Sequence, residues 1–298
     1  MKQKKMTWAT RLFIVIMAGI VLFAMTVLSV NLMHTSRAEK YKKENELFTT
    51  AAKILVPNGA YAALGIPETK RSFGEDTQQP YYIKQNIGYQ NSDDAMMIKG
   101  TLKKQSGAWK ALPAPLFSNR ICVVKQSLFL NASQKQSDQK WRELSAESGT
   151  WHQLWFGFKK SLNSLDYFNQ YAWLLESQDA SGGIVSSVFK TSDSPDAVAL
   201  SYPGNYTWYN SPPDYTASSM YVQFKNDLKQ LGEQQKQVQK YLDSGIFGKE
   251  LNVNFENRSK YVESRLCDVL GFVACVKEEK LKKLRQDDLL YLIDFDPS

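Results

Sequence analysis

The hydrophobic pattern begins with an uncharged apolar run at residues 12–33, LFIVIMAGIVLFAMTVLSVNLM. About 20 consecutive apolar residues are enough for a helix to cross the hydrocarbon core of a bilayer. A secretory signal has a shorter apolar core, followed by small residues at its cleavage site. Here residues 36–38 offer only a poor site, because Arg37 lies at its centre. We therefore predict a transmembrane anchor that is retained, with a cleaved signal as the alternative.

A polar helical pattern follows the apolar run. Residues 34–56 are predicted to continue as a juxtamembrane helix that ends before Pro57-Asn58-Gly59, a strong stop signal. The next segment, 57–115, is interrupted throughout by glycine and proline, which predicts loops with short strands near 81–89 and 96–102. Residues 116–131 fit either a strand or a helix, and we favour a helix there and at 137–147.

The strongest periodic pattern in the chain is aromatic. Apolar side chains recur at helical spacing over residues 151–173, namely Trp151, Leu154, Trp155, Phe158, Leu162 and Leu165, with Trp173 widening the face. This predicts a helix in the core of the domain. The alternative is a groove that binds a ligand between Trp151, Trp155 and Trp173.

A second long helix is predicted after a polar stretch. Residues 177–214 are rich in Ser, Asp, Gly and Pro, which indicates a possible sub-boundary with short strands at 184–190 and 197–202. Residues 215–242 then form two heptad rows, Tyr221, Leu228 and Leu242 in one and Phe224, Leu231 and Val238 in the other. We expect this helix to pack inside the chain. The alternative is that it binds other envelope proteins or a second copy of the chain.

Further helices are predicted from about residue 254 to Gly271 and over 276–292. The expected architecture is therefore an α+β chain that is mainly α with minor β. It comprises a tail at 1–11, the anchor at 12–33, the juxtamembrane helix at 34–56 and a helical extracytoplasmic domain at 57–298.

The net charge of +7 is concentrated at the N-terminus. Residues 1–46 hold eight cations and three anions, which leaves the remainder nearly neutral. This distribution suits anionic headgroups beside residues 12–33 and excludes a separate basic domain for nucleic acid. The cations on the two sides of the run nearly balance, and the free amino terminus favours a cytoplasmic tail with the domain outside.

Two of the three cysteines, Cys267 and Cys275, flank Gly271, which suits the C′ position of a helix. Two antiparallel helices joined at Gly271 would bring their sulfurs together, so we predict a disulfide in an oxidising compartment. The alternative is two buried, reduced thiols. Cys122 lies in an apolar setting that favours inert burial.

Signatures of catalysis are missing from the sequence. Only His34 and His152 are present, and no zinc, P-loop, nucleophile-elbow or dinucleotide motif occurs. We therefore predict no cofactor, no metal site and no catalytic residue. A glycosidase-like enzyme stays open, because the two acids of such an enzyme lie far apart in sequence.

Four short segments resemble a family of single-pass inner-membrane proteins of Gram-negative bacteria whose function is unknown. They are Pro57–Tyr61, Trp208–Tyr215, Phe255–Arg258 and Leu266–Gly271, and together with the helix after Tyr215 they span about a third of the chain. The resemblance implies the bacterial inner membrane, with the C-terminal domain in the periplasm. The expected function is a non-enzymatic scaffold or assembly factor, for example of a secretion, conjugation or pilus apparatus. The alternatives are an enzyme acting on envelope polymers and a ligand-binding sensor.

Overall fold

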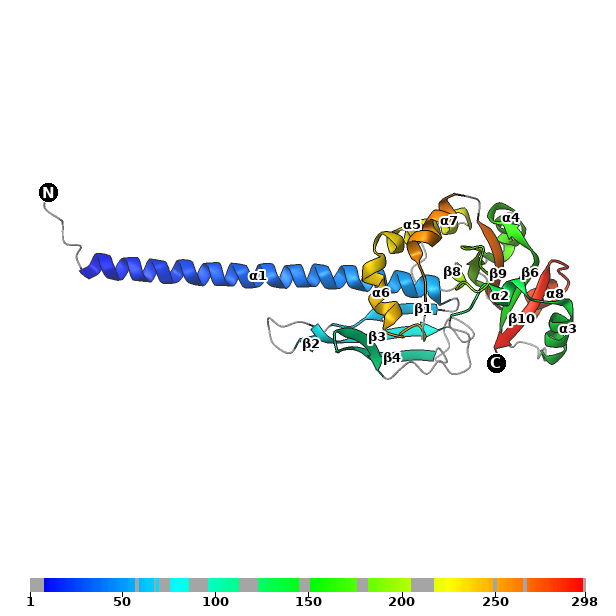
Figure 1. Ribbon diagram of the computed structural model, residues 1–298, viewed down its shortest axis with the longest axis horizontal. Helices are drawn as coiled ribbons and strands as arrows, with labels where there is room; N and C mark the ends of the chain where they lie inside the picture. The colour runs from blue at the N-terminus through cyan, green and yellow to red at the C-terminus, as the bar shows by residue number, and fades with distance from the viewer. Residues whose placement is uncertain are drawn as a thin grey trace. The chain divides into compact units, whose positions relative to one another are not determined.

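The structure is a computed structural model that describes residues 8–56, 59–66, 68–69, 76–85, 96–112, 123–144, 151–175, 182–204, 217–248, 251–264 and 267–296 (Figure 1). It divides into two compact units, Met1–Asn45 and Glu46–Ser298. The proposed Trp208–Tyr215 motif and Cys122 lie outside the described residues.

The first unit contains most of helix α1 (Trp8–Leu55), which is continuous through the predicted anchor and juxtamembrane segments. Its apolar stretch has a mean hydropathy of 2.3 and none of that stretch is buried. The helix is therefore long and apolar enough to cross a membrane.

The second unit begins with an antiparallel sheet, which we call the first sheet. Its strands are β1 (Gly59–Leu64), β2 (Glu68–Thr69), β3 (Asp76–Gln85), β4 (Met96–Gln105) and β5 (Ala108–Leu112). They are ordered β1-β3-β4-β5, with β2 also paired to β3. One face covers the buried end of α1, where Phe48, Ile54 and Leu55 are inaccessible to solvent. The two strands predicted near 81–89 and 96–102 are thus confirmed, with shifted bounds.

The second sheet comprises β6 (His152–Asn163), β7 (Gly182–Phe189), β8 (Leu200–Pro203), β9 (Asp268–Val276) and β10 (Leu290–Asp296). Its order is β10-β6-β9-β7-β8, and every neighbouring pair is antiparallel. Helix α4 (Ser164–Leu175) connects β6 to β7 with β9 between them, and α8 (Glu278–Arg285) connects β9 to β10 with β6 between them. Two interleaved split βαβ units of this kind form the topology of a ferredoxin-like domain.

Both faces of the second sheet are buried, because different elements cover them. On one face lies an aromatic layer from β6, α4 and β9, with ring centroids 5.1–5.8 Å apart in successive pairs, formed by Phe156, Phe158, Tyr167, Tyr171 and Phe272. On the other face the short helix α2 (Ser127–Leu130) places Phe129 against Trp155 and Val273. Helix α3 (Gln134–Glu143) covers the edge of β10, where the backbone N–H of Leu292 donates to Ser137 Oγ at 2.9 Å.

Three helices are inserted between β8 and β9: α5 (Ala217–Glu233), α6 (Gln235–Asp243) and α7 (Phe255–Glu263). Figure 1 shows α5 and α7 side by side. Gln234 separates α5 from α6, so the helix predicted over 215–242 is two helices. The side chain of Gln235 accepts from the N–H of Phe255 at 2.7 Å and donates to the carbonyl of Val253 at 3.0 Å, which fixes the start of α7 to that of α6.

The prediction of a mainly helical domain with minor β is wrong. Residues 152–163, read as part of an aromatic helix, form β6, and only Ser164–Leu175 is helical. Residues 268–276 form β9, whereas a helix was expected up to Gly271. The C-terminal helix ends at Arg285 and the chain then forms β10. A strand covered on both faces carries a continuous apolar run, and such a run matches helical spacing by coincidence.

Candidate functional site

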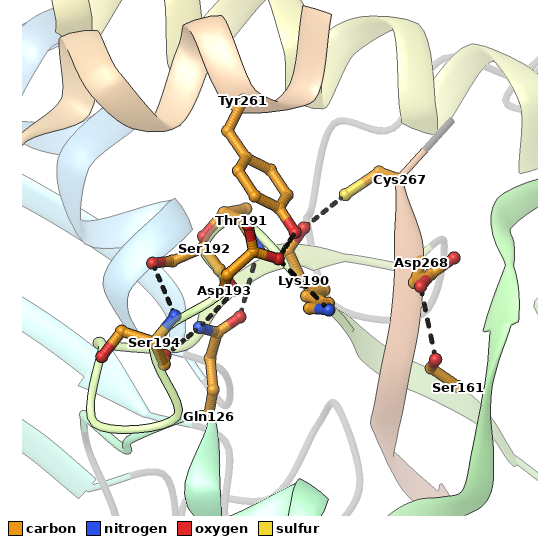
Figure 2. Close-up of polar contacts among 10 residues, drawn as sticks. All are labelled: Gln126, Ser161, Lys190, Thr191, Ser192, Asp193, Ser194, Tyr261, Cys267 and Asp268. Carbon is orange, nitrogen blue, oxygen red and sulfur yellow. Dashed lines mark hydrogen bonds and ion pairs between the residues drawn. The ribbon is translucent and has the colours of Figure 1, made fainter. Parts of the chain in front are cut away.

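The most elaborate polar arrangement in the described part of the domain surrounds residues 190–197, which follow β7 and which we call the pinned loop. Gln126 lies beneath it and is fully buried (Figure 2). The Gln126 side chain accepts from the N–H of Thr191 at 3.1 Å and donates to the carbonyls of Ser192 at 3.2 Å and Ser194 at 2.9 Å. One glutamine thus fixes three successive points of the loop.

The backbone around Gln126 extends this attachment. The N–H of Gln126 donates to the carbonyl of Ala197 at 2.8 Å, and the N–H of Ser127 donates to that of Pro195 at 2.7 Å. Within the loop, the N–H of Ser194 donates to Ser192 Oγ at 3.2 Å. These backbone groups are therefore satisfied inside the protein, and the hydrogen bonds hold the loop backbone in one position.

The outer side of the pinned loop presents two aspartates. Asp193 accepts from Tyr261 Oη at 2.9 Å and pairs with Lys190 Nζ at 3.5 Å. Asp196 pairs with Lys125 Nζ at 3.2 Å, and the two aspartate side chains are 70% and 79% exposed. Figure 2 shows Tyr261 reaching down from α7 to this loop, so three separate segments position its charged groups.

The start of β9 supports the other end of the loop. Cys267 Sγ contacts the carbonyl of Lys190 at 2.8 Å, and the N–H of Lys190 donates to the carbonyl of Asp268 at 2.8 Å. Ser161 Oγ donates to Asp268 Oδ2 at 3.3 Å (Figure 2). Cys267 is therefore a buried residue that supports the backbone of the pinned loop at Lys190.

This geometry corrects the predicted Cys267–Cys275 disulfide. The chain between the two residues is the extended strand β9, with no reversal at Gly271. At about 3.3 Å per residue their Cα atoms are roughly 26 Å apart, far beyond the Cα separation of about 7 Å that a disulfide tolerates. Both cysteines are buried in the domain, so the observed positions fit the alternative of two buried thiols.

The heptad residues do not form a surface for a partner. Phe224, Leu228, Leu231 and Val238 are fully buried inside the domain. Tyr221 is partly exposed, but its hydroxyl accepts from the backbone N–H of Cys267 at 3.1 Å. Burial raises the pKa of Tyr221 above its ordinary value, although the hydrogen bond from the N–H of Cys267 acts in the opposite direction. These side chains therefore hold α5 and α6 within the domain.

The three tryptophans predicted to share a groove do not lie together. Trp155 is buried in the core beside Phe129, and Trp151 packs at the margin of the same core. Trp173 lies on α4, where Lys283 Nζ is 3.6 Å from the centre of its indole ring. Trp151 and Trp155 thus share one core, whereas Trp173 lies on α4, so the three residues do not line a common groove.

An open polar cleft of about 320 Å³ lies between α3, α8 and β6. Its charged lining comprises Asp138, Arg142, Lys159, Arg285, Asp287 and Asp288, beside Trp141. Both oxygens of Asp287 are occupied, since Oδ2 accepts from Tyr171 Oη and Oδ1 from the N–H of Leu289, each at 2.9 Å. Burial, together with Asp287, raises the pKa of Tyr171 beyond its ordinary range. Asp287 therefore fixes the turn before β10.

A third polar group joins the end of α1 to the domain. Lys53 Nζ pairs with Asp227 at 2.8 Å and donates to the hydroxyl of Tyr202, which itself donates to Asp227 at 2.7 Å. Lys53 Nζ also lies 4.1 Å from the centre of the Tyr202 ring. Because Lys53, Tyr202 and Asp227 come from α1, β8 and α5, this group ties together three elements of the second unit.

No protein-family model, curated protein sequence or solved structure matches this chain in the three comparisons made. Among the described residues, no group of His, Cys, Asp and Glu is placed to hold a metal ion. Residues 177–214 are recognisable from the sequence as rich in turn residues, but no signal in them singles out the pinned loop. Gln126 gave no signal, because a lone glutamine beside an apolar segment does not reveal which loop it will bind.

Proposed function

We propose that this protein is a membrane-anchored scaffold or assembly factor of the bacterial cell envelope. Helix α1 would be the anchor in the inner membrane, and the second unit would lie in the periplasm. The observation that carries the proposal is that α1 continues without a break from its apolar stretch into the core of the folded domain. A domain built around the end of its own anchor is suited to holding partners at a fixed place on a membrane.

The attachment of α1 to the domain combines apolar and polar contacts. Phe48 packs edge-to-face against Tyr241 and stacks on Phe247, with ring centroids 5.3 and 5.7 Å away. Thr49 Oγ1 donates to the carbonyl of Ala62 at 2.9 Å, and Lys53 joins Asp227 and Tyr202. These contacts hold the end of α1, from Phe48 onward, inside the second unit.

The pinned loop is the surface we propose for the partner. Residues 193–196 are exposed, yet buried Gln126 holds the backbone beside them. A loop that is already ordered loses little conformational entropy when it binds, which favours recognition. Its two aspartates would select a partner surface that offers N–H donors or cations.

Two experiments test the proposal, and the first tests topology. A phosphatase fused to the C-terminus should be active in cells, since that enzyme requires the periplasm. A fluorescent protein that folds only in the cytoplasm should stay dark at the same position. The reverse result would contradict both the location and the topology.

The second experiment tests the pinned loop in living cells. A photo-crosslinking amino acid at Ser194 should yield one defined adduct, whereas the same residue at exposed Glu233 on α5 should not. Gln126→Ala should weaken the Ser194 adduct, because it releases the loop while the exposed side chains remain. Equal adducts from both positions, or an adduct indifferent to Gln126→Ala, would remove the loop as the binding surface.

The glycosidase alternative would require two carboxylates available at one cleft. In the cleft beside α3, Asp287 is engaged by Tyr171 and Leu289, and Asp138 Oδ1 accepts from Gln134 Nε2 at 2.7 Å. Two of the three aspartates that line this cleft are therefore held by neighbouring groups.

A further inference from the structure

The outer face of the first sheet is unusual in its charge. Side chains alternate across the sheet, so residues two apart along a strand share a face. On the inner face Tyr81, Ile83 and Leu102 are buried. The opposite face, which we call the lysine face, carries Pro80, Tyr82, Lys84, Lys99, Thr101, Lys103, Lys110 and Leu112.

The strand register places the lysines together. Lys103 of β4 is directly opposite Lys110 of β5, and Lys99 is directly opposite Tyr82 of β3. Like charges directly opposite on a sheet are destabilising. The described residues of the first sheet contain only two carboxylates, Asp76 at the start of β3 and Glu68 of β2, against the four lysines of this face. The domain therefore maintains a positive surface at some cost in stability.

The lysine face is also amphipathic. Tyr82 and Leu112 are 37% and 39% exposed, and they lie among the lysines in the strand register. A tyrosine and a leucine surrounded by flexible cations match the composition of surfaces that rest on the headgroup region of a bilayer. The buried inner face holds the strands in place, so the backbone that carries the cations is fixed.

We infer that the lysine face docks on the anionic phospholipid headgroups of the membrane that holds α1. This inference rests on the proposed anchoring of α1. Only residues 34–45, about 18 Å of helix, connect the apolar run to the second unit. That short connection keeps a bilayer surface at a high effective concentration near the domain. Each lysine that reaches an anionic surface adds to the attraction.

Chemical labelling of the full-length chain in lipid nanodiscs tests this inference. Discs are made from phosphatidylcholine alone or from phosphatidylcholine with phosphatidylglycerol. Acetylation rates of Lys99, Lys103 and Lys110 are then followed by mass spectrometry. Exposed Lys229 and Lys236 on α5 and α6 serve as reference lysines in the same molecule.

We expect the lysine face to be acetylated about fivefold more slowly in the anionic discs, with the reference lysines unchanged. High salt should abolish the difference, because it screens exposed charges. The Lys99→Glu variant should return Lys103 and Lys110 to their rates in neutral discs, whereas Lys236→Glu should not. Thermal unfolding of each variant checks that the domain remains folded.

Three outcomes would overturn the inference. Equal rates in both discs would show that anionic lipid is not bound. Protection that persists in high salt would show a contact that does not depend on the lysine charges. Protection by soluble polyphosphate without protection by anionic discs would assign the face to a soluble polymer. Failure of the chain to enter discs, seen by size exclusion, would overturn the anchor as well, so the two failures are distinguishable.

Discussion

Gly157 of β6 and Gly271 of β9 lie directly opposite one another in the second sheet, and Phe129 of α2 occupies the space above them. A Cβ on Gly271 would overlap the carbonyl oxygen of Phe156 and lie 2.7 Å from Phe129 Cδ1. A Cβ on Gly157 would lie 2.9 Å from Ile293 Cδ1 and 3.2 Å from the carbonyl oxygen of Phe129. The paired glycines therefore allow α2 to pack closely on the second sheet. Gln126, which holds the pinned loop, directly precedes α2.

The first prediction concerns this glycine pair. Gly271→Ala should lower the free energy of unfolding by more than about 2 kcal/mol, since backbone and a buried ring must both move. Gly157→Ala should cost less, because its nearest neighbour is the flexible end of Ile293. Ile293→Val removes that end and should partly rescue Gly157→Ala but not Gly271→Ala. Urea unfolding of Gly271→Ala and Gly157→Ala, each with and without Ile293→Val, measures these differences.

Gly19→Ala is the matched control, because its Cβ would meet nothing within 4 Å. It should leave the unfolding of the domain unchanged. If Gly271→Ala were as stable as Gly19→Ala, the close packing of Phe129 over the sheet would be contradicted.

The second prediction concerns the attachment of α1. Lys53 and Asp227 are only 22% and 23% exposed, so removing one charge leaves the other partly desolvated. Asp227→Asn should lower the free energy of unfolding by roughly 1–3 kcal/mol. Tyr202→Phe, which removes hydrogen bonds and keeps the ring, should cost about 1 kcal/mol.

The exposed pair Lys125–Asp196 provides the control for this measurement. Asp196→Asn should change stability by less than about 1 kcal/mol, as is usual for surface ion pairs. Equal effects of Asp196→Asn and Asp227→Asn would show that the Lys53 group does not fasten α1.

The third prediction concerns pH. His152 is buried at the start of β6, and burial lowers its pKa below the ordinary value of 6.5. The unfolded chain therefore binds a proton first as the pH falls through about 6.5. The contribution of His152 to the free energy of unfolding should be constant above pH 7. Below pH 7 the free energy of unfolding should decrease by up to about 1.4 kcal/mol per pH unit, until His152 of the folded protein is also protonated.

Chemical unfolding between pH 7 and pH 5 tests this sign, with His152→Gln as the comparison. The variant should lose less stability on acidification than the natural chain. A natural chain and a variant with parallel pH profiles would contradict the assignment to His152.

The errors of the sequence analysis share one physical origin. Residues 152–158 of β6 are all buried, so the strand shows no alternation of polar and apolar positions. Its spacing of Trp151, Leu154, Trp155 and Phe158 then matched a helix better than a strand. β9 is likewise buried along nearly its whole length, and Gly271, read as a helix stop, serves to admit Phe129. Segments distant in sequence cover both faces of β6 and β9, and these contacts decide that the two segments form strands. No local sequence pattern predicts such contacts.

Elements with one solvated face were predictable, because buried and exposed positions alternate along their sequence. β4 alternates buried Ile98 and Leu102 with exposed Lys99 and Lys103, which is a direct strand signal. Helix α1 was predictable from length and the absence of charge alone. The pinned loop was not, because it depends on a buried Gln126 that lies more than 60 residues earlier in the chain.

A net charge that is summed along the sequence does not show which face of a sheet carries the cations, so it does not predict the lysine face. The sum beyond residue 46 is nearly neutral, but the pleat of the first sheet gathers cations on one side. Strand register, and not net charge, thus identifies the lysine face. The same register supplies the fourth prediction.

Lys110→Glu should stabilise the domain while weakening its contact with anionic lipid. A glutamate at this position would face Lys103 across the β4–β5 pair, so an opposite-charge pair replaces a like-charge pair. Cross-strand pairs of this kind contribute roughly 0.2–1 kcal/mol, so the free energy of unfolding should rise by about that amount. Lys236→Glu, on exposed helix α6, is the control and should not reproduce the gain. In anionic nanodiscs the Lys110→Glu variant should also leave Lys99 and Lys103 more reactive toward acetylation. A variant that gains stability and keeps full protection would separate the like-charge cost from lipid binding, and the surplus of lysines would then need another cause.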